Sequence, residues 1–227
     1  MTHSIHVGFI VVPNYLSALK LFLNFVSAVM LLPDKPEKIN LPTSNNHLHR
    51  TLSLTNAAGS AGDFHALRDT LNKRIQDNCF NTKSTFDFVI DETFSSSLLN
   101  SLLQTLSTLN RGVTHKNAFD SLITHLCKFQ CVDDALHAIK YMARTDAGGC
   151  RPSATTFYPV LNILSRQEAI GHARRVVDFM STLGVNLDLT GHNYFLVAHC
   201  YVGDVAAAAG VLKKMGGRWD WCGCAYV

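Results

Sequence analysis

A pattern that occurs three times between residues 116 and 215 constrains this chain more than any other feature. Each copy places an alanine seven residues before a methionine, in the pairs Ala135 and Met142, Ala173 and Met180, and Ala208 and Met215. An upstream landmark repeats with the same offsets of 38 and 35 residues, at Asp120, Tyr158 and Asn193. Self-similarity with a period of about 20–50 residues is typical of stacked supersecondary units, so the sequence predicts a repeat array in place of one closed core.

The apolar side chains within a copy predict two helices. In the first copy, one stripe at helical spacing consists of Leu122, Ile123 and Leu126, and a second consists of Val132, Leu136, Ile139 and Met142. Two such stripes separated by a short turn indicate a helical hairpin, and the alanine inside each second helix lets the two helices pack closely. The longer turn at 144–150 accounts for the 38-residue offset, because insertions in repeat arrays fall in loops.

The amino-acid sequences of the three copies resemble the repeat of a known protein family. The first copy, AFDSLITHLCK followed by VDDALHAIKYM, closely resembles the pentatricopeptide repeat of plant proteins. TFYPVLNILSR with GHARRVVDFM, and GHNYFLVAHCY with AAAAGVLKKM, match it more loosely. No copy shows the Trp and Gly-x-x-Tyr signature of the tetratricopeptide repeat. The resemblance covers 116–215 and implies an all-α fold, a right-handed α-solenoid of helix-turn-helix repeats.

Weaker echoes of the repeat precede residue 116. Asp63 is the expected N-cap of a helix with Phe64, Leu67, Leu71 and Ile75 on its apolar face and Arg68, Lys73 and Arg74 on its outer face. Residues 85–90 then echo 118–123, and the leucine-rich stretch 98–109 predicts another second helix. We therefore expect an array over 63–215 of about three and a half to four repeats, bounded as 63–82 (a half repeat), 83–115, 116–153, 154–188 and 189–223.

The N-terminal residues differ from the array. Residues 1–33 are apolar, and 15–32 approach the length of about 20 residues that a bilayer span needs, although Lys20 and Asn24 interrupt them. No basic region precedes this stretch and it holds no arginine, which fits neither a secretory signal nor a mitochondrial presequence. A targeting segment, an anchor and a buried or membrane-surface helix all stay open. Residues 34–62, rich in Pro, Asn, Ser, Thr and Gly, predict a linker or a disordered segment.

Residues 216–227, GGRWDWCGCAYV, depart from the repeat pattern and hold both tryptophans of the chain. One choice of codons for them, read one nucleotide later, encodes Glu-Glu-Gly-Gly-Ile-Gly-Ala-Asp-Ala-Arg-Thr, which restores the Asp that the family places at a repeat end. We therefore expect an altered frame or splice and an array shortened at its C-terminus. A terminal repeat without a polar cap leaves an apolar face uncovered, so the last hairpin is expected to be frayed or dependent on a partner.

Composition limits the chemistry. With 47% hydrophobic and 16% charged residues the chain is globular, and its net charge of +3 is compatible with a polyanionic partner without requiring one. Seven irregularly spaced cysteines do not form a disulfide framework; Cys127 and Cys200, at equivalent places in two first helices, are expected to be small buried side chains. The dispersed histidines, His125 among them, are expected on the surface or satisfied in the core. Because no nucleophile elbow, P-loop, dinucleotide fingerprint or His-Glu-x-x-His motif occurs, we expect no enzymatic activity, cofactor, metal site or small-molecule substrate.

The resemblance also assigns positions that face RNA. Members read single-stranded RNA one base per repeat, through a residue near the start of the first helix and the last residue of the repeat. In this chain those pairs are Asp120 with Ser153, Tyr158 with Asp188, and Asn193 with Gly223. The family's base code favours Asn193, which implies uracil when a terminal Asp accompanies it, but Gly223 has no side chain to set the base. Tyr158 departs from the code and is expected to stack on a base or to pack.

Basic side chains on or near the predicted helices are candidates for contacts with the RNA backbone: Lys116, Lys128, Arg151, Arg166, Arg174, Arg175, Lys213 and Lys214. The leading hypothesis is a non-catalytic organellar adaptor that binds single-stranded RNA in processing, stability, editing or translation, in mitochondria first and chloroplasts second. The alternative is a protein–protein scaffold, for instance in an organellar ribosome, that uses the concave face of the solenoid. A shortened gene product with little activity is a third possibility. Membrane binding is not expected, although 15–32 leaves it open.

Overall fold

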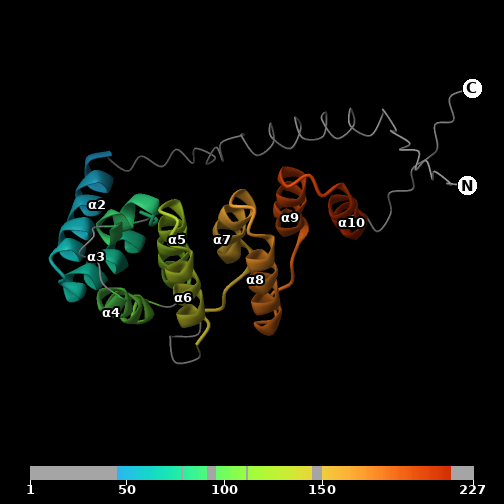
Figure 1. Cartoon of the computed structure of the whole chain (residues 1–227). Helices are drawn as coiled ribbons and strands as arrows, with labels where there is room; N and C mark the ends of the chain where they lie inside the picture. Colours follow the sequence, from blue (N-terminus) through green and yellow to red (C-terminus); the bar gives the residue numbers. More distant parts are fainter. Residues whose placement is uncertain (1–44, 78, 91–95, 111, 145–149, 216–227) are drawn as a thin grey trace, which may run out of the picture. The chain divides into compact units, whose positions relative to one another are not determined.

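A computed structural model describes residues 45–77, 79–90, 96–110, 112–144 and 150–215, without the side chains of residues 45–48, 90, 113 and 114. The regular structure within these ranges is helical throughout (Figure 1): α2 (Asn45–Ser60), α3 (Phe64–Gln76), the 3-10 helix η1 (Lys83–Ile90), α4 (Ser96–Ser107), α5 (Val113–Lys128), α6 (Val132–Met142), α7 (Ala154–Arg166), α8 (Ile170–Thr182), α9 (Leu189–Tyr201) and α10 (Val205–Met215). The apolar segment 1–33 and the tail 216–227 lie outside the described residues. None of the described helices is long and apolar enough to cross a bilayer.

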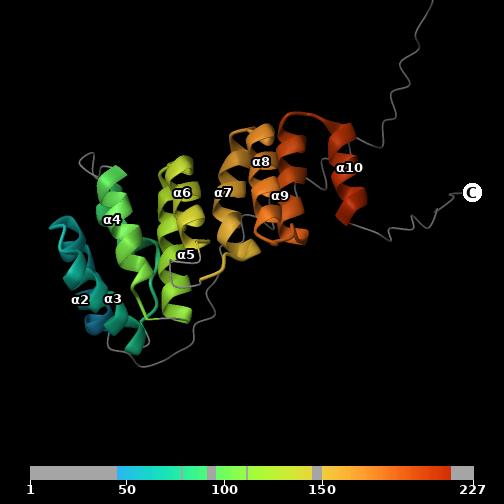
Figure 2. The ribbon, with the colours of Figure 1, turned by 90° about the horizontal axis from the view of Figure 1, so that it is seen from below.

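The helices stack as hairpins in chain order (Figure 2). α2 packs on α3, α5 on α6, α7 on α8, and α9 on α10. The first helices also contact one another in succession, from α2 to η1, α5, α7 and α9, and we call this series the first-helix layer. The second helices are α3, α4, α6, α8 and α10, of which α3 packs on α4 and α4 on α6. Since these contacts join near neighbours in the series, the predicted all-α repeat solenoid is confirmed.

The core lies between the first and second helices. A single cluster of buried apolar side chains extends from α3 to α9. The three alanines that define the repeat, Ala135, Ala173 and Ala208, are all buried, as the sequence predicts. Met142 and Met180 are buried as well, whereas Met215 on α10 is half-buried. The landmarks that fix the repeat period are therefore the residues through which the helices of each hairpin pack.

Four hairpin turns are closed by a residue with left-handed backbone. Gly62, Gln130, Glu168 and Gly203 have φ values of 69°, 63°, 57° and 73°. In each turn the next amide donates to a carbonyl near the end of the first helix: Asp63 to Ala58 at 3.0 Å, Cys131 to Leu126 at 3.0 Å, Ala169 to Leu164 at 2.9 Å, and Asp204 to His199 at 2.9 Å. Glycine adopts this region freely, whereas Gln130 and Glu168 hold it at a cost of about 1 kcal/mol each.

Completing the turn between α7 and α8 is expected to stabilise the array. Ala169, the N-cap of α8, has no side-chain oxygen, whereas Asp63 at the equivalent place before α3 accepts from the Ala66 amide at 2.9 Å. We expect Glu168→Gly and Ala169→Asp each to raise the free energy of unfolding by about 1 kcal/mol, measured from the urea midpoint. Arg175→Gly, in the exposed middle of α8, is the matched control and should lower it by about 1 kcal/mol. A lower midpoint for Glu168→Gly would contradict the turn geometry.

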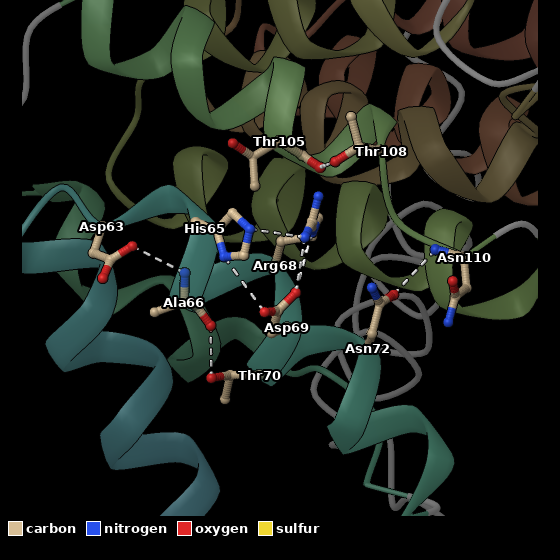
Figure 3. A network of polar contacts seen from close by, with 10 residues as sticks. All are labelled: Asp63, His65, Ala66, Arg68, Asp69, Thr70, Asn72, Thr105, Thr108 and Asn110. Carbon is tan, nitrogen blue, oxygen red and sulfur yellow. Dashed lines mark hydrogen bonds and ion pairs between the residues drawn. The ribbon is translucent and has the colours of Figure 1, made fainter.

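Polar contacts fix α3 at its start and tie it to the next repeat (Figure 3). Its predicted N-cap is confirmed by the Asp63 carboxylate, which accepts from the Ala66 amide. On the exposed face, the Arg68 guanidinium donates to Asp69 Oδ1 at 3.2 and 3.1 Å. Asn72 Oδ1 accepts from the Asn110 amide at 3.0 Å, which joins α3 to the chain leaving α4. These bonds help set how the second repeat follows the first.

The structure corrects the expectation for residues 34–62. Residues 45–60, predicted as linker, form α2, which packs on both α3 and η1. Its buried face includes Thr51 and Thr55, and the Thr55 hydroxyl donates to the Thr51 carbonyl at 2.8 Å. A polar composition therefore does not prevent burial here, because the helix backbone satisfies part of the face that it buries. The predicted half repeat 63–82 is the second part of a complete hairpin.

Arg74 is buried, with 1% of its surface exposed, so its predicted place on the outer face of α3 is wrong. Its guanidinium donates to Asn81 Oδ1 at 3.2 Å, to Thr51 Oγ1 at 2.9 Å and to the Phe80 carbonyl at 3.1 Å. Burial lowers the pKa of this guanidinium from its usual value. The hydrogen bonds replace those that water would make to an exposed arginine, which is why the charge can lie inside.

The first element of the second repeat is a 3-10 helix, although its sequence echoes an α-helix of the next repeat. Phe86 within η1 has φ −118° and ψ 28°, and the Thr85 hydroxyl accepts from the Thr82 amide at 2.9 Å. The β-branched and aromatic residues of η1 are weak helix formers, which explains the difference. The following helix, predicted at 98–109, extends from Ser96 to Ser107 and buries Leu99, Leu102, Leu103 and Leu106, while Leu109 is buried just beyond its end.

His125 connects α5 to η1 from inside the core. It is fully buried, and its Nδ1 lies 2.6 Å from the Lys83 carbonyl oxygen, to which it donates. Burial is the largest influence on the imidazole and lowers its pKa, against the opposing effect of the Asp87 carboxylate 3.7 Å away. The expectation of a satisfied histidine is confirmed at Nδ1. Nε2 has no hydrogen-bond partner within the described ranges.

Candidate nucleic-acid interface

The landmark residues of the three clear repeats lie on successive first helices. Asp120 is on α5, Tyr158 on α7 and Asn193 on α9, and we call these positions the reading row. α5 contacts α7, and α7 contacts α9. All three side chains are half-buried. The structure thus places the row along one layer, with each member partly accessible to a ligand.

Tyr158 and Asp188, which the repeat pattern assigns to one pair, are in direct contact. The Tyr158 hydroxyl donates to Asp188 Oδ2. Asp188 is the N-cap of α9, and its Oδ1 accepts from the Gly191 amide at 2.9 Å. Aspartate is favoured at this place because its carboxylate satisfies an amide that the helix leaves free. The helix that begins the next repeat therefore fixes the last residue of this one.

This contact leaves the proton on the tyrosine. Burial raises the pKa of Tyr158, and the hydrogen bond to Asp188 raises it further. Burial alone would raise the pKa of Asp188 too, but the hydrogen bonds from Tyr158 and from the Gly191 amide lower it below its usual range. At neutral pH the pair is a neutral phenol beside a carboxylate.

The other described pair, Asp120 and Ser153, is connected through Thr156. The Thr156 hydroxyl accepts from the Ser153 amide at 3.2 Å and donates to Asp120 Oδ1 at 2.8 Å. Asp120 Oδ2 pairs with Lys116 Nζ, which also lies 3.4 Å from the Thr156 hydroxyl. Ser153 is the N-cap of α7, so this capping geometry holds the pair together. Lys116 supplies a positive charge beside the carboxylate.

Asn193 stands beside an aromatic pair. Within the described part of the chain its side chain has no hydrogen-bond partner, and its expected partner at position 223 lies outside that part. The ring of the adjacent Tyr194 meets the Tyr158 ring with centroids 5.9 Å apart and planes inclined at 53°. Both rings are half-buried. Two neighbouring positions of the reading row are therefore joined by aromatic surface.

The predicted backbone-contact residues fall into three groups. Lys116 is paired with Asp120. Lys128 and Arg166 are exposed at the ends of α5 and α7, in equivalent repeat positions, and Arg151 is exposed just before α7. The remaining candidates are exposed on second helices: Arg174 and Arg175 on α8, and Lys213 and Lys214 on α10. Lys128 and Arg166 thus belong to the first-helix layer that carries the reading row, while the last group lies on the other layer.

Two residues of the site escape sequence reasoning. Thr156 has a detectable signal, because it follows Ser153 at the three-residue spacing of a capping box. Tyr194 directly follows a landmark, but its contact with Tyr158 depends on how α7 packs on α9, which residue spacing alone does not determine.

The described residues offer hydrogen bonds, aromatic faces and positive charge rather than metal ligands. Among them, no group of three or more His, Cys, Asp or Glu side chains could hold a metal ion. Burial raises the pKa of Cys127 to about 12, so its thiol stays protonated and the predicted small buried side chain is confirmed there. Cys200, at the equivalent place, is half-buried.

Comparison with known proteins agrees with the geometry. The family described as pentatricopeptide repeat-containing protein matches residues 81–215, more than half of the chain. A mitochondrial pentatricopeptide repeat-containing protein of Arabidopsis thaliana is 44% identical over 158 residues, which cover 70% of this chain and 44% of the relative. A second such Arabidopsis protein is 36% identical over 145 residues, covering 63% and 40%. The chain spans less than half the length of these curated relatives. With its period, its stacked hairpins and these matches, the chain belongs to the pentatricopeptide repeat family and resembles plant members of it.

Proposed function

We propose that this protein is a non-catalytic mitochondrial adaptor that binds single-stranded RNA, acting in RNA processing, stability, editing or translation. The observation that carries the proposal is the pairing of reading positions: Tyr158 contacts Asp188 directly, and Asp120 is joined to Ser153 through Thr156. Helical-repeat proteins read single-stranded RNA with two or three side chains per repeat. Both relatives are mitochondrial by name, which supports that compartment.

The charges of the first-helix layer support the same proposal. Lys128 and Arg166 are exposed at equivalent ends of successive first helices, the same helices that carry Asp120 and Tyr158 of the reading row. Regularly spaced cations can follow a phosphate backbone, while aromatic and amide groups meet the bases. This combination suits a single strand, whose bases are free to stack.

The distribution of apolar side chains favours RNA over a peptide helix as the ligand. A groove for an amphipathic helix needs apolar anchors along its length. The exposed large apolar side chains of the described residues lie mainly toward the two ends of the array: Leu54, Phe80, Phe129, Leu189, Tyr201, Val202, Val205 and Leu212. The middle of the first-helix layer presents the polar and aromatic reading row in their place.

Removing the two first-helix cations is expected to weaken RNA binding and its salt dependence together. For Lys128→Ala with Arg166→Ala in the full chain, the log–log slope of affinity against salt should become shallower by about 1.4, because each phosphate contact on a single strand contributes about 0.7. Fluorescence anisotropy with a labelled random-sequence RNA at several salt concentrations measures both quantities.

The matched control is Arg174→Ala with Arg175→Ala, which removes the same charge from α8 on the second helices. Its slope should stay near that of the unmodified protein. Equal losses in both double variants would indicate attraction by overall charge instead of a site on the first-helix layer. Absence of binding by the unmodified protein at low salt would end the RNA proposal and leave the protein–protein scaffold.

A further inference from the structure

We propose that Tyr158 removes base selection from its own repeat: by holding the Asp188 carboxylate it keeps that group away from base edges, and with Tyr194 it offers a stacking surface that accepts any base. The inference rests on the proposed RNA-binding function and adds to it, since it assigns one repeat to sequence-independent contact. It also identifies the side chain whose hydroxyl suppresses selection.

Both oxygens of the Asp188 carboxylate already have donors within the protein. Oδ2 accepts from the Tyr158 hydroxyl, and Oδ1 accepts from the Gly191 amide at the start of α9. Each carboxylate oxygen has two lone pairs, so a base that donated to Oδ2 would either share that oxygen with the phenol or displace the phenol from it. Sharing adds a bond to a carboxylate whose charge two donors already stabilise, and displacement replaces one hydrogen bond by another, so little energy remains to distinguish bases.

The hydroxyl of Tyr158 is occupied by the same contact. Its O–H group donates to Asp188 Oδ2, and the Thr190 side chain also hydrogen bonds to the Tyr158 hydroxyl. A phenol held in this way has no proton to offer a base. What Tyr158 still offers a base is its aromatic ring, on a side chain that is half-buried.

The ring of Tyr158 has a partner of the same kind on the next first helix. The Tyr158 and Tyr194 centroids are 5.9 Å apart, and their planes are inclined at 53°. Every nucleobase has an aromatic face, so stacking on side chains of this type gives affinity without hydrogen-bond selection, worth about tenfold per base. The side-chain amide of the neighbouring Asn193 has no hydrogen-bond partner among the described residues, so it can hydrogen bond to the edge of a base.

In the preceding repeat, too, both oxygens of the reading carboxylate interact with donors within the protein, here from different residues. Asp120 Oδ1 accepts from Thr156 and Oδ2 pairs with Lys116. Two successive repeats thus satisfy their reading carboxylates internally. Tyr158 is the sharper test, because one oxygen atom can be removed from it while its ring is kept.

The experiment compares three full-chain variants in binding to a randomised single-stranded RNA pool, with sequencing of the bound fraction. Tyr158→Phe keeps the ring and frees one acceptor site on Asp188 Oδ2, so we expect affinity within about twofold and a new preference of about tenfold, at one position, for the base whose N–H donor best reaches that oxygen. Adding Asp188→Asn, which still caps α9, should abolish or change that preference. Tyr158→Leu should lower affinity about tenfold for every sequence.

Tyr141→Leu, which changes a half-buried tyrosine on the second helix α6, is the matched control and should leave affinity and selection unchanged. Thermal melting of each variant checks that the array stays folded, and Tyr158→Phe serves if Tyr158→Leu does not fold. The inference is overturned if the unmodified protein binds RNA but Tyr158→Phe gains no preference, or if Tyr158→Leu binds as tightly as the unmodified protein. An unmodified protein that binds no RNA at low salt would refute the proposed function itself.

Discussion

The variant Arg74→Met is expected to lose about 3 kcal/mol of stability in the α2–α3 hairpin. The substitution keeps most of the apolar stem but removes the guanidinium. Asn81 Oδ1 and Thr51 Oγ1, which accept in buried hydrogen bonds, then lose the guanidinium as a donor, and each unsatisfied buried acceptor costs about 1–3 kcal/mol. Relief of the buried charge offsets part of this loss, because burial already disfavours the charged guanidinium.

Hydrogen exchange of the α2 and α3 amides is the suitable measurement, because a repeat array opens locally from its ends. Protection should fall in α2 and α3 while α7 and α8 stay protected. Lys73→Met, one residue away and exposed, is the matched control and should change stability by no more than about 0.5 kcal/mol. If both variants exchange alike, Arg74 does not have the role described.

Combining Arg74→Met with a substitution of one of the residues that accept from Arg74 makes the test more specific. Adding Thr51→Val to Arg74→Met removes an oxygen that the guanidinium contacts at 2.9 Å. We expect the double variant to be less destabilised than the sum of the single ones, because the two side chains share one buried network. Strict additivity would show that Arg74 stabilises the hairpin through its stem alone.

Residue spacing predicts the repeat but not its beginning. The period of Ala135, Ala173 and Ala208 reveals the hairpins because these positions have the same neighbours in every copy. The spacing of Leu67, Leu71 and Arg74 is also that of one helical face, yet a buried arginine becomes understandable only once Asn81 and Phe80 are seen around it. Partners that come from a loop leave no periodic signal in the sequence.

For the candidate site, too, residue spacing predicts one part of the arrangement and not the rest. The pairs Asp120 with Ser153 and Tyr158 with Asp188 follow from the repeat register, and the structure brings the members of both pairs together. That the members of a pair hydrogen bond to each other, directly or through Thr156, does not follow from register. It depends on side-chain lengths and on how each first helix sits on the next.

Helix α2 is the clearest case of a missed element. The run from Ala57 to Ser60 is typical of a linker, because its glycine and serine weaken a helix in isolation. In the structure the same small residues allow contact: an atom added at the Cβ position of Gly59 would lie 2.4–2.5 Å from the Phe88 ring. Helix propensity and tertiary packing give opposite indications here, and packing decides.

Gly59→Ala is therefore expected to destabilise the array, although alanine is the better helix former. The new methyl group would overlap the ring of Phe88, which is only 8% exposed and also contacts Phe86 at a centroid distance of 6.2 Å. Overpacking of this kind costs about 1–3 kcal/mol, against about 1 kcal/mol gained in helix propensity. We expect a net loss of up to about 2 kcal/mol in urea unfolding, with increased exchange in α2 and η1.

Gly210→Ala provides the control of opposite sign. Gly210 lies in the middle of α10, and an added Cβ there meets no atom within 4 Å, so the variant should gain up to about 1 kcal/mol from propensity alone. Combining Gly59→Ala with Phe88→Leu should cost less than the two changes separately, since the smaller side chain makes room for the methyl group. A stabilised Gly59→Ala would show that α2 does not approach η1 this closely.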